Sequence, residues 1–218
     1  MTVLILLFLC FYLGLSIARP ILALQVLILL LPSYLLRFTV SGIPFTVLEA
    51  MILLVTVVTT IRVLLHQQSL EPLRAFVLHH RGSMLLIAMF IVAGIIGVVA
   101  AGDTKAALGI FKAYLMEPLL LFGVWILCVR TSQDLRRIIY AAIACGTVIA
   151  LYGMVQWWNP TLIPAPWNAE ALFRVTSFYE YPNAVGLIIG PLLILAIGML
   201  VDGTSSVRTR IMLAISIV

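Results

Sequence analysis

Charged side chains are scarce in this 218-residue sequence: 13 Lys and Arg and 8 Asp and Glu make up only 10% of it, while 64% of the residues are apolar. A typical soluble domain is about 25% charged and about 45–50% apolar. So few charges cannot cover the water-facing surface of a globular protein, and a disordered chain would be far less hydrophobic. The composition therefore predicts a membrane protein whose residues lie mostly in bilayer-spanning segments.

Cysteine and histidine are scarce as well. The three cysteines, Cys10, Cys128 and Cys145, form no Cys-x-x-Cys pattern and cannot build a disulfide scaffold, so we expect them to be packing residues. His79 and His80 are adjacent, but no carboxylate or cysteine stands beside them at ligand spacing, which favours solvated histidines over a metal site. We predict no metal, no cofactor and no nucleic-acid partner.

The long apolar runs predict transmembrane helices, because crossing the bilayer core takes about 20 mostly apolar residues. These runs lack the alternation of apolar and polar residues that is typical of a barrel strand. They therefore favour an all-α, polytopic membrane domain covering residues 1–218. The predicted spans are residues 2–18, 21–36, 43–65, 83–101, 108–129, 138–156 and 185–201. An eighth run, 211–218, rises only about 12 Å as a helix. We therefore expect seven helices plus the start of an eighth, from a chain that is C-terminally incomplete.

The basic residues predict which side of the membrane each loop occupies, because cytoplasmic loops are rich in Lys and Arg. The odd-numbered loops and their edges contain Arg19, Arg62, Arg74, Arg81, Arg130, Arg136, Arg137, Arg208 and Arg210. The even-numbered loops contain Arg37, Lys105 and Arg174. The odd loops are therefore predicted to be cytoplasmic, which places the loop at 157–184 outside. The cytoplasmic loop at 66–82 is expected to hold an interfacial turn.

The external loop at 157–184 ends in a pattern typical of an anion site. Pro182 and Asn183 predict a helix start, because Asn caps helices well and Pro suits the first turn. A helix N-terminus carries a partial positive charge, and Arg174 with the hydroxyls of Thr176 and Ser177 precedes it closely in sequence. Phosphate is the natural occupant of such a site. The alternative is a capped helix with an interfacial arginine.

Three charged residues lie inside predicted spans, where ionised groups are costly and usually functional or paired. They are Glu49, Lys112 and Glu117. Lys112 and Glu117 are five residues apart, about 140° around an α-helix, so we expect each to reach a neighbouring helix or a polar cavity. The sequence leaves two roles open for these charged residues, an interhelical ion pair and a contact with substrate. Pro118 is expected to kink its helix, and Glu49, Lys112 and Arg174 are expected to converge in the outer leaflet.

Residues 174–186, Arg-Val-Thr-Ser-Phe-Tyr-Glu-Tyr-Pro-Asn-Ala-Val-Gly, are similar to the Arg…Gly-x-Phe…Pro-Asn stretch of the O-antigen ligase family. That family also includes O-antigen polymerases and related bacterial polysaccharide ligases. Residues 37–49 resemble its early Pro…Leu-Glu/Asp segment, and residues 108–118 resemble its middle segment. Ser177 replaces a glycine that is common in the first motif.

The resemblance implies glycosyl transfer at the outer face of the cytoplasmic membrane. A glycan would move from undecaprenyl pyrophosphate to a glycan or glycolipid acceptor, without a nucleotide sugar or a metal. Arg174 would bind the donor pyrophosphate, with Asn183 and Lys112 beside it and with Glu49 and Glu117 as supporting charges. The family's catalytic external loop, with a second Arg and a His, follows several more spans, so we expect these residues to lack it. The alternative function is a transporter or flippase for a lipid-linked or anionic substrate.

Overall fold

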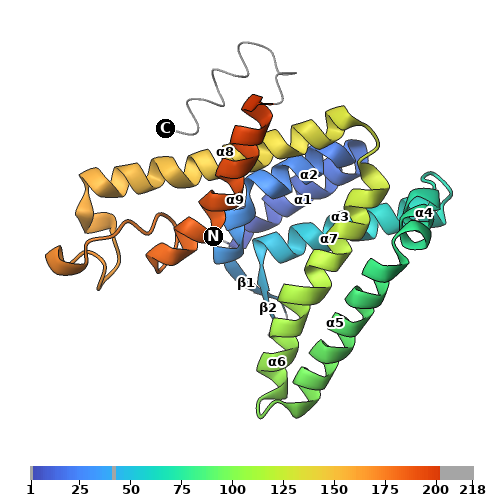
Figure 1. The fold of residues 1–218 in the computed structure, drawn as a ribbon, viewed down its shortest axis with the longest axis horizontal. Coiled ribbons are helices and arrows are strands. Elements are labelled where there is room, and N and C mark those ends of the chain that lie inside the picture. The colour runs from blue at the N-terminus through green and yellow to red at the C-terminus, as the bar shows by residue number, and fades with distance from the viewer. Residues whose placement is uncertain (1, 41–42, 202–218) are drawn as a thin grey trace. The chain divides into compact units, whose positions relative to one another are not determined.

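The computed structural model describes residues 2–40 and 43–201, in which helices joined by loops are accompanied by one short hairpin (Figure 1). The chain divides into two compact units. The first contains residues 1–27 and 33–135, and the second contains residues 28–32 and 136–218. The single-domain prediction stays a prediction, and the predicted partial span at 211–218 lies outside the described residues.

Among the described residues, five helices are long and apolar enough to cross a membrane, as expected of a multi-pass membrane protein. They are α3 (Val47–Leu64), α5 (Arg81–Ala100), the continuous helix Thr104–Cys128, α8 (Ser132–Trp158) and α9 (Pro182–Val201). The helices at the N-terminus, α1 (Thr2–Ala18) and α2 (Pro20–Leu29), are apolar but shorter. The prediction of seven spans is therefore not confirmed.

The predicted span at 21–36 is wrong in its second half. Helix α2 ends at Leu29 and is followed by a 3₁₀ turn, Leu31–Leu35. Pro32 lacks a backbone donor and disfavours the α conformation in the residue before it, which accounts for the end of the helix there. Strands β1 (Arg37–Val40) and β2 (Ile43–Thr46) then pair antiparallel. The predicted span at 43–65 consequently begins as a strand rather than as a helix.

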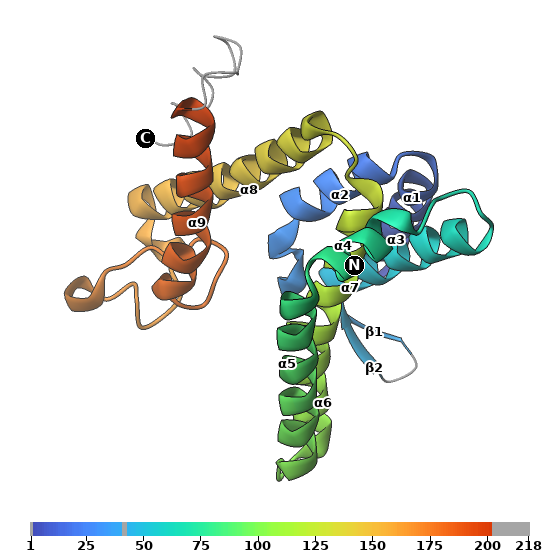
Figure 2. The same ribbon diagram turned by 45° about the vertical axis from the view of Figure 1, so that its right-hand side comes forward.

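The first unit is built from helices packed in pairs. Helix α3 packs against both α1 and α7 (Glu117–Cys128), and α5 packs against α6 (Thr104–Phe111). Figures 1 and 2 both show α5 and α6 side by side. Gly94 makes this approach possible, because a Cβ there would lie 2.7 Å from two ring carbons of Phe111. A larger residue at position 94 would require the Phe111 ring to move.

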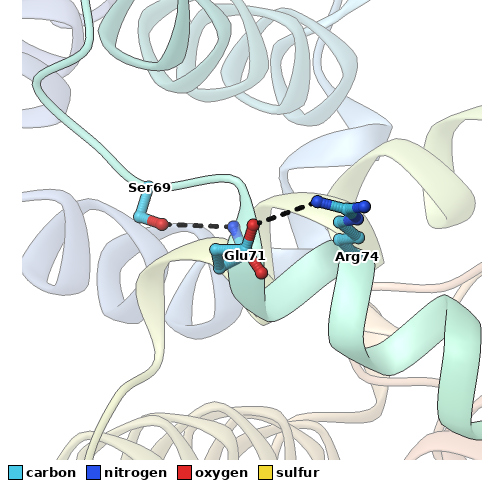
Figure 3. Close-up of polar contacts among 3 residues, drawn as sticks. All are labelled: Ser69, Glu71 and Arg74. Carbon is cyan, nitrogen blue, oxygen red and sulfur yellow. Dashed lines mark hydrogen bonds and ion pairs between the residues drawn. The ribbon is translucent and has the colours of Figure 1, made fainter.

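The loop between α3 and α5, where the sequence predicts an interfacial turn, contains a short helix, α4 (Glu71–His79), and its place at the membrane interface stays a prediction. Figure 3 shows its start, where Glu71 N donates a hydrogen bond of 3.2 Å to Ser69 Oγ. Arg74 Nη1 lies 3.5 Å from Glu71 Oε1 one turn later. The helix packs against α7, where Phe76 meets the edge of the Phe122 ring at 5.4 Å between centroids. Loop 66–82 is therefore an ordered part of the first unit.

The sequence Thr131-x-x-Asp134 is a capping pattern that predicts a helix after it, and the start of α8 confirms this prediction. Thr131 Oγ1 accepts a hydrogen bond from Asp134 N at 3.1 Å, and Asp134 Oδ2 accepts from Thr131 N at 3.1 Å. This reciprocal arrangement is a capping box, which satisfies two backbone donors that the first helical turn leaves unpaired.

The second unit is built around α8 and α9. Cys145 and Ile149 of α8 form a buried cluster with Tyr179 and Ala184, and Leu31 packs against it. Ile143, Ala196 and Met199 form a second cluster. The first cluster joins both helices to Tyr179 of the loop between them, and the second joins the two helices to each other, so α8 and α9 position that loop.

Candidate functional site

The loop between α8 and α9 is the first candidate site. It contains two short 3₁₀ turns, Pro160–Leu162 and Glu170–Leu172. Helix α9 begins at Pro182, so the predicted helix start is confirmed, although Asn183 lies in the first turn rather than at the cap. The side chains of Arg174 and Asn183 are both exposed. The most strongly basic group of this loop is therefore open to its surroundings.

Gln156, which the sequence analysis missed, holds this loop from the last turn of α8. Its Oε1 accepts hydrogen bonds from Thr176 N at 2.9 Å and from Ser177 N at 2.7 Å. Its Nε2 donates to Ser177 O at 3.0 Å and to Leu162 O at 3.2 Å. The Gln156 side chain is almost fully buried, so these bonds are shielded from water.

Ser177 adopts a backbone conformation that favours glycine, with φ at +52°. Its hydroxyl donates a hydrogen bond of 2.7 Å to Ile149 O of α8, and Thr176 Oγ1 lies 3.4 Å from Gln156 Nε2. Both residues are buried. The hypothesis that these two hydroxyls bind an anion beside Arg174 is therefore corrected, since they fix the loop to α8 instead.

Aromatic side chains and backbone bonds secure the rest of this loop. Arg174 N donates a hydrogen bond of 3.1 Å to Trp167 O, and Trp167 Nε1 donates one of 3.1 Å to Glu180 O. The Phe178 ring stacks on Tyr152 of α8 at 4.6 Å between centroids. The backbone of Arg174 is consequently anchored on a folded loop, while its side chain projects from it.

Glu49 lies in the first turn of α3, nearer the start of its helix than the predicted span at 43–65 implies. Thr46 caps the helix, and its Oγ1 accepts a hydrogen bond of 3.1 Å from Glu49 N. The error follows from strand β2, which occupies the first four residues of the predicted span. A carboxylate in the first turn is stabilised by the partial positive charge of the helix N-terminus.

Lys112 of the helix Thr104–Cys128 reaches across to Glu49 of α3. The Lys112 Nζ and Glu49 Oε1 atoms lie 2.5 Å apart, and Nζ also lies 5.4 Å from the centroid of the Phe45 ring. The Glu49 side chain is 7% exposed, whereas that of Lys112 is 44% exposed. The interhelical ion pair, one of the two alternatives that the sequence leaves open, is present, and the Lys112 side chain stays partly exposed.

Residues Lys112–Met116 form a π-helical turn between α6 and α7, in which Glu117 N donates to Lys112 O. The expected separation of about 140° between Lys112 and Glu117 assumes an α-helix, and it does not hold here. Widening the turn brings residues five apart toward one face, and the charges of Lys112 and Glu49 both act on Glu117. Pro118 accounts for the wider turn, because its ring would clash with the carbonyl four residues earlier in a regular helix.

Glu117 is 8% exposed, and its Oε1 has no hydrogen-bond partner among the described residues. It lies 13 residues, or about 20 Å, into the continuous helix that begins at Thr104. Buried polar atoms nearly always have a partner, so an orphaned carboxylate oxygen needs an explanation. Glu117 Oε1 is therefore able to accept a bond from a ligand.

The two adjacent histidines make local contacts. His79 Nδ1 lies 2.9 Å from Ala75 O, and His80 Nδ1 lies 3.0 Å from Phe76 O. Within residues 2–40 and 43–201, no group of three or more His, Cys, Asp or Glu side chains is placed to hold a metal ion.

The two candidate sites lie in different units of the chain. Glu49, Lys112 and Glu117 belong to the first unit, and Arg174 and Asn183 belong to the second. Their predicted convergence in the outer leaflet, and their roles toward a donor, stay predictions. No family model, curated protein or solved structure matches this chain. The similarity to the O-antigen ligase family rests on the sequence motifs alone.

Proposed function

We propose that this chain contributes the donor-binding part of an O-antigen ligase-like glycosyltransferase at the outer face of the cytoplasmic membrane. In this proposal a glycan leaves undecaprenyl pyrophosphate and joins the sugar of an acceptor. The observation that carries it is the conformation of Ser177, at φ +52° in the loop that opens α9. The family motif commonly has glycine here, and glycine is the residue that this conformation favours.

The chemistry of the loop supports an anionic donor. Departure of undecaprenyl pyrophosphate places extra negative charge on the leaving phosphate, and a preorganised cation lowers the energy of that step. Arg174 offers a planar set of donors suited to phosphate, and its backbone is fixed by the hydrogen bond to Trp167 O. The N-terminus of α9, with Asn183 in its first turn, adds backbone donors to the same loop. The general base belongs to the catalytic external loop that the resemblance implies.

Lys112 has a supporting role in this proposal. Its ion pair with Glu49 holds the ammonium group at a fixed place at the N-terminal end of α3, and the first unit would thereby add a positive charge that suits an anionic donor. Glu117 supplies an acceptor for a donor group such as a sugar hydroxyl. These roles give a cation for the pyrophosphate and an acceptor for the glycan.

Replacement of Arg174 tests the proposal directly. We expect Arg174→Ala to weaken binding of undecaprenyl pyrophosphate at least tenfold in lipid nanodiscs, measured by native mass spectrometry of the purified protein. Arg174→Lys should bind at an intermediate level, because it keeps the charge but loses the planar pair of donors. Lys105→Ala, which removes an exposed cation from α6, is the matched control and should bind normally. Equal binding by Arg174→Ala and the control would remove Arg174 from the donor site.

A transporter or flippase for a lipid-linked or anionic substrate is the second candidate. It is favoured by Glu117, whose orphaned oxygen lies beside a π-helical turn in mid-helix. Charged residues within a span and interrupted helices are typical of transport pathways. A flippase should move a fluorescent polyprenyl-phosphate lipid between leaflets of proteoliposomes, and Glu117→Gln should slow that movement at least tenfold. If the lipid moves no faster in proteoliposomes than in empty liposomes, the second candidate is wrong.

A further inference from the structure

Helix α4 presents an apolar stripe that its own fold does not cover. Leu70, Leu73, Val77 and Leu78 recur at the spacing of one helical face, and with Arg74 they line a shallow groove of about 240 Å³. Leu70, Val77 and Leu78 are between 40% and 51% exposed. A stripe of this kind on a nine-residue helix needs an apolar environment outside the chain.

A different face of α4 makes the contact with the rest of the unit. Phe76 meets Phe122 of α7, and the His80 ring stacks on Phe76 at 4.4 Å between centroids. Phe76 lies about 120° around the helix from Leu70. The contact with α7 therefore fixes α4 in place and directs its apolar stripe elsewhere.

The position of α4 in the chain places this stripe at a membrane surface. Helix α3 ends at Leu64 and α5 begins at Arg81, and both are long and apolar enough to span. The segment that joins two such helices lies where one leaflet meets water. An amphipathic helix in that zone buries its apolar side at the boundary between headgroups and acyl chains.

The charges around the stripe suit a lipid of negative charge. Arg62, Arg74 and Arg81 lie in the stretch from the end of α3 to the start of α5, against the single carboxylate of Glu71. The Arg74 side chain is exposed, and its contact with Glu71 is 3.5 Å long and open to solvent, which makes it weak. Arg74 is therefore available for a stronger bond to a phosphate group.

We infer that α4 is a binding surface for anionic phospholipid. Leu70, Leu73, Val77 and Leu78 lie among the upper acyl chains, and Arg74, which lies between Leu70 and Leu78 around the helix, extends from the stripe to bind a headgroup phosphate. This surface lies where α4 joins the end of α3 to the start of α5. It does not depend on the proposed donor site. It would fix the first unit at a defined depth in one leaflet.

Fluorescent labels at two positions test where α4 lies. Val77→Cys and Gln67→Cys are each labelled in a Cys10→Ser background, in nanodiscs of phosphatidylcholine with about one third phosphatidylglycerol. Cys10 is exposed, whereas the other two native cysteines are buried. We expect lipids with a nitroxide near the headgroup to quench the label at position 77 at least threefold more strongly than the label at position 67. Equal quenching would overturn the inference, and so would protection of position 77 from water without quenching, since a protein partner would then cover the stripe.

The charge dependence tests the headgroup. Quenching at position 77 should fall at least twofold when phosphatidylglycerol is omitted. Adding Arg74→Gln should remove this dependence, whereas Lys105→Gln, at the start of α6, should leave it intact. Quenching that is the same with and without anionic lipid would show that the stripe binds no anionic headgroup and would overturn that part of the inference.

Discussion

Gln156→Leu should lower the free energy of unfolding by about 3 kcal/mol, because leaving a buried polar group without a partner costs about 1–3 kcal/mol. The substitution keeps the volume of the side chain but removes the acceptor of Thr176 N and Ser177 N. It also leaves Ser177 O and Leu162 O without this donor. The loss is measured by unfolding in mixed detergent micelles.

The effect of Gln156→Leu should be largest in the loop before α9. Hydrogen exchange at the amides of Thr176 and Ser177 should accelerate at least tenfold, since their protection depends on Gln156 Oε1. Gln67→Leu, at an exposed position after α3, is the matched control and should change neither measurement. Normal protection of these two amides in Gln156→Leu would contradict the role of Gln156. Gln156→Glu, which keeps an acceptor oxygen in place of Oε1 but loses the Nε2 donor, should retain more of the protection.

Lys112→Met should destabilise the first unit because it leaves the Glu49 carboxylate buried without its cation. Breaking a buried ion pair by removing one partner costs about 3–5 kcal/mol. The Lys112 side chain is 44% exposed, so screening reduces this to about 2 kcal/mol. Unfolding in mixed micelles measures the change, and Lys105→Met on the exposed surface of α6 is the matched control.

A second substitution separates the charge of Lys112 from its packing. Glu49→Gln combined with Lys112→Met removes both charges, and the double variant should recover at least half of the lost stability. A double variant as unstable as the sum of the two single ones would mean that the ion pair between α3 and the helix Thr104–Cys128 is not what Lys112 contributes.

The helices that the sequence predicts well are those where apolar composition alone decides the structure. Helices α5, α8 and α9 contain the predicted spans almost whole, because about 20 consecutive apolar residues leave few other structures possible. The same criterion fails at Ile43–Thr46, since a short apolar run fits a strand as well as a helix. Gly42 was the available sequence signal for a turn between two strands.

Two capping patterns show how an error in a predicted helix start leads to an error about a candidate site residue. Thr131 and Asp134 are correctly predicted as a helix start, whereas the equivalent pair Thr46 and Glu49 was placed inside a span. Glu49 consequently looked like a charge within the membrane core rather than a first-turn residue. The partnership of Glu49 with Lys112 joins residues 63 positions apart, and no local pattern predicts such a contact.

Gln156 was within reach of sequence analysis, since it is a polar residue in the last turn of a long apolar helix. Its five hydrogen-bonding partner atoms could not be predicted, because they depend on how residues 162–177 fold back onto α8. Burial of Thr176 and Ser177 follows from the same folding.

The π-helical turn at Lys112–Met116 also sets the direction in which the side chains of the second half of this helix project, relative to those of the first half. Before it, Phe111 faces Gly94 of α5, and after it, Phe122 faces Phe76 of α4. Because this turn holds about one residue more than an α-helical turn, deleting a single residue from it would allow a regular α-helix and leave the residues after it on nearly the same faces. Phe122 would keep its contact with Phe76. Inserting a further residue would instead rotate everything after it by about 100° and separate these two rings.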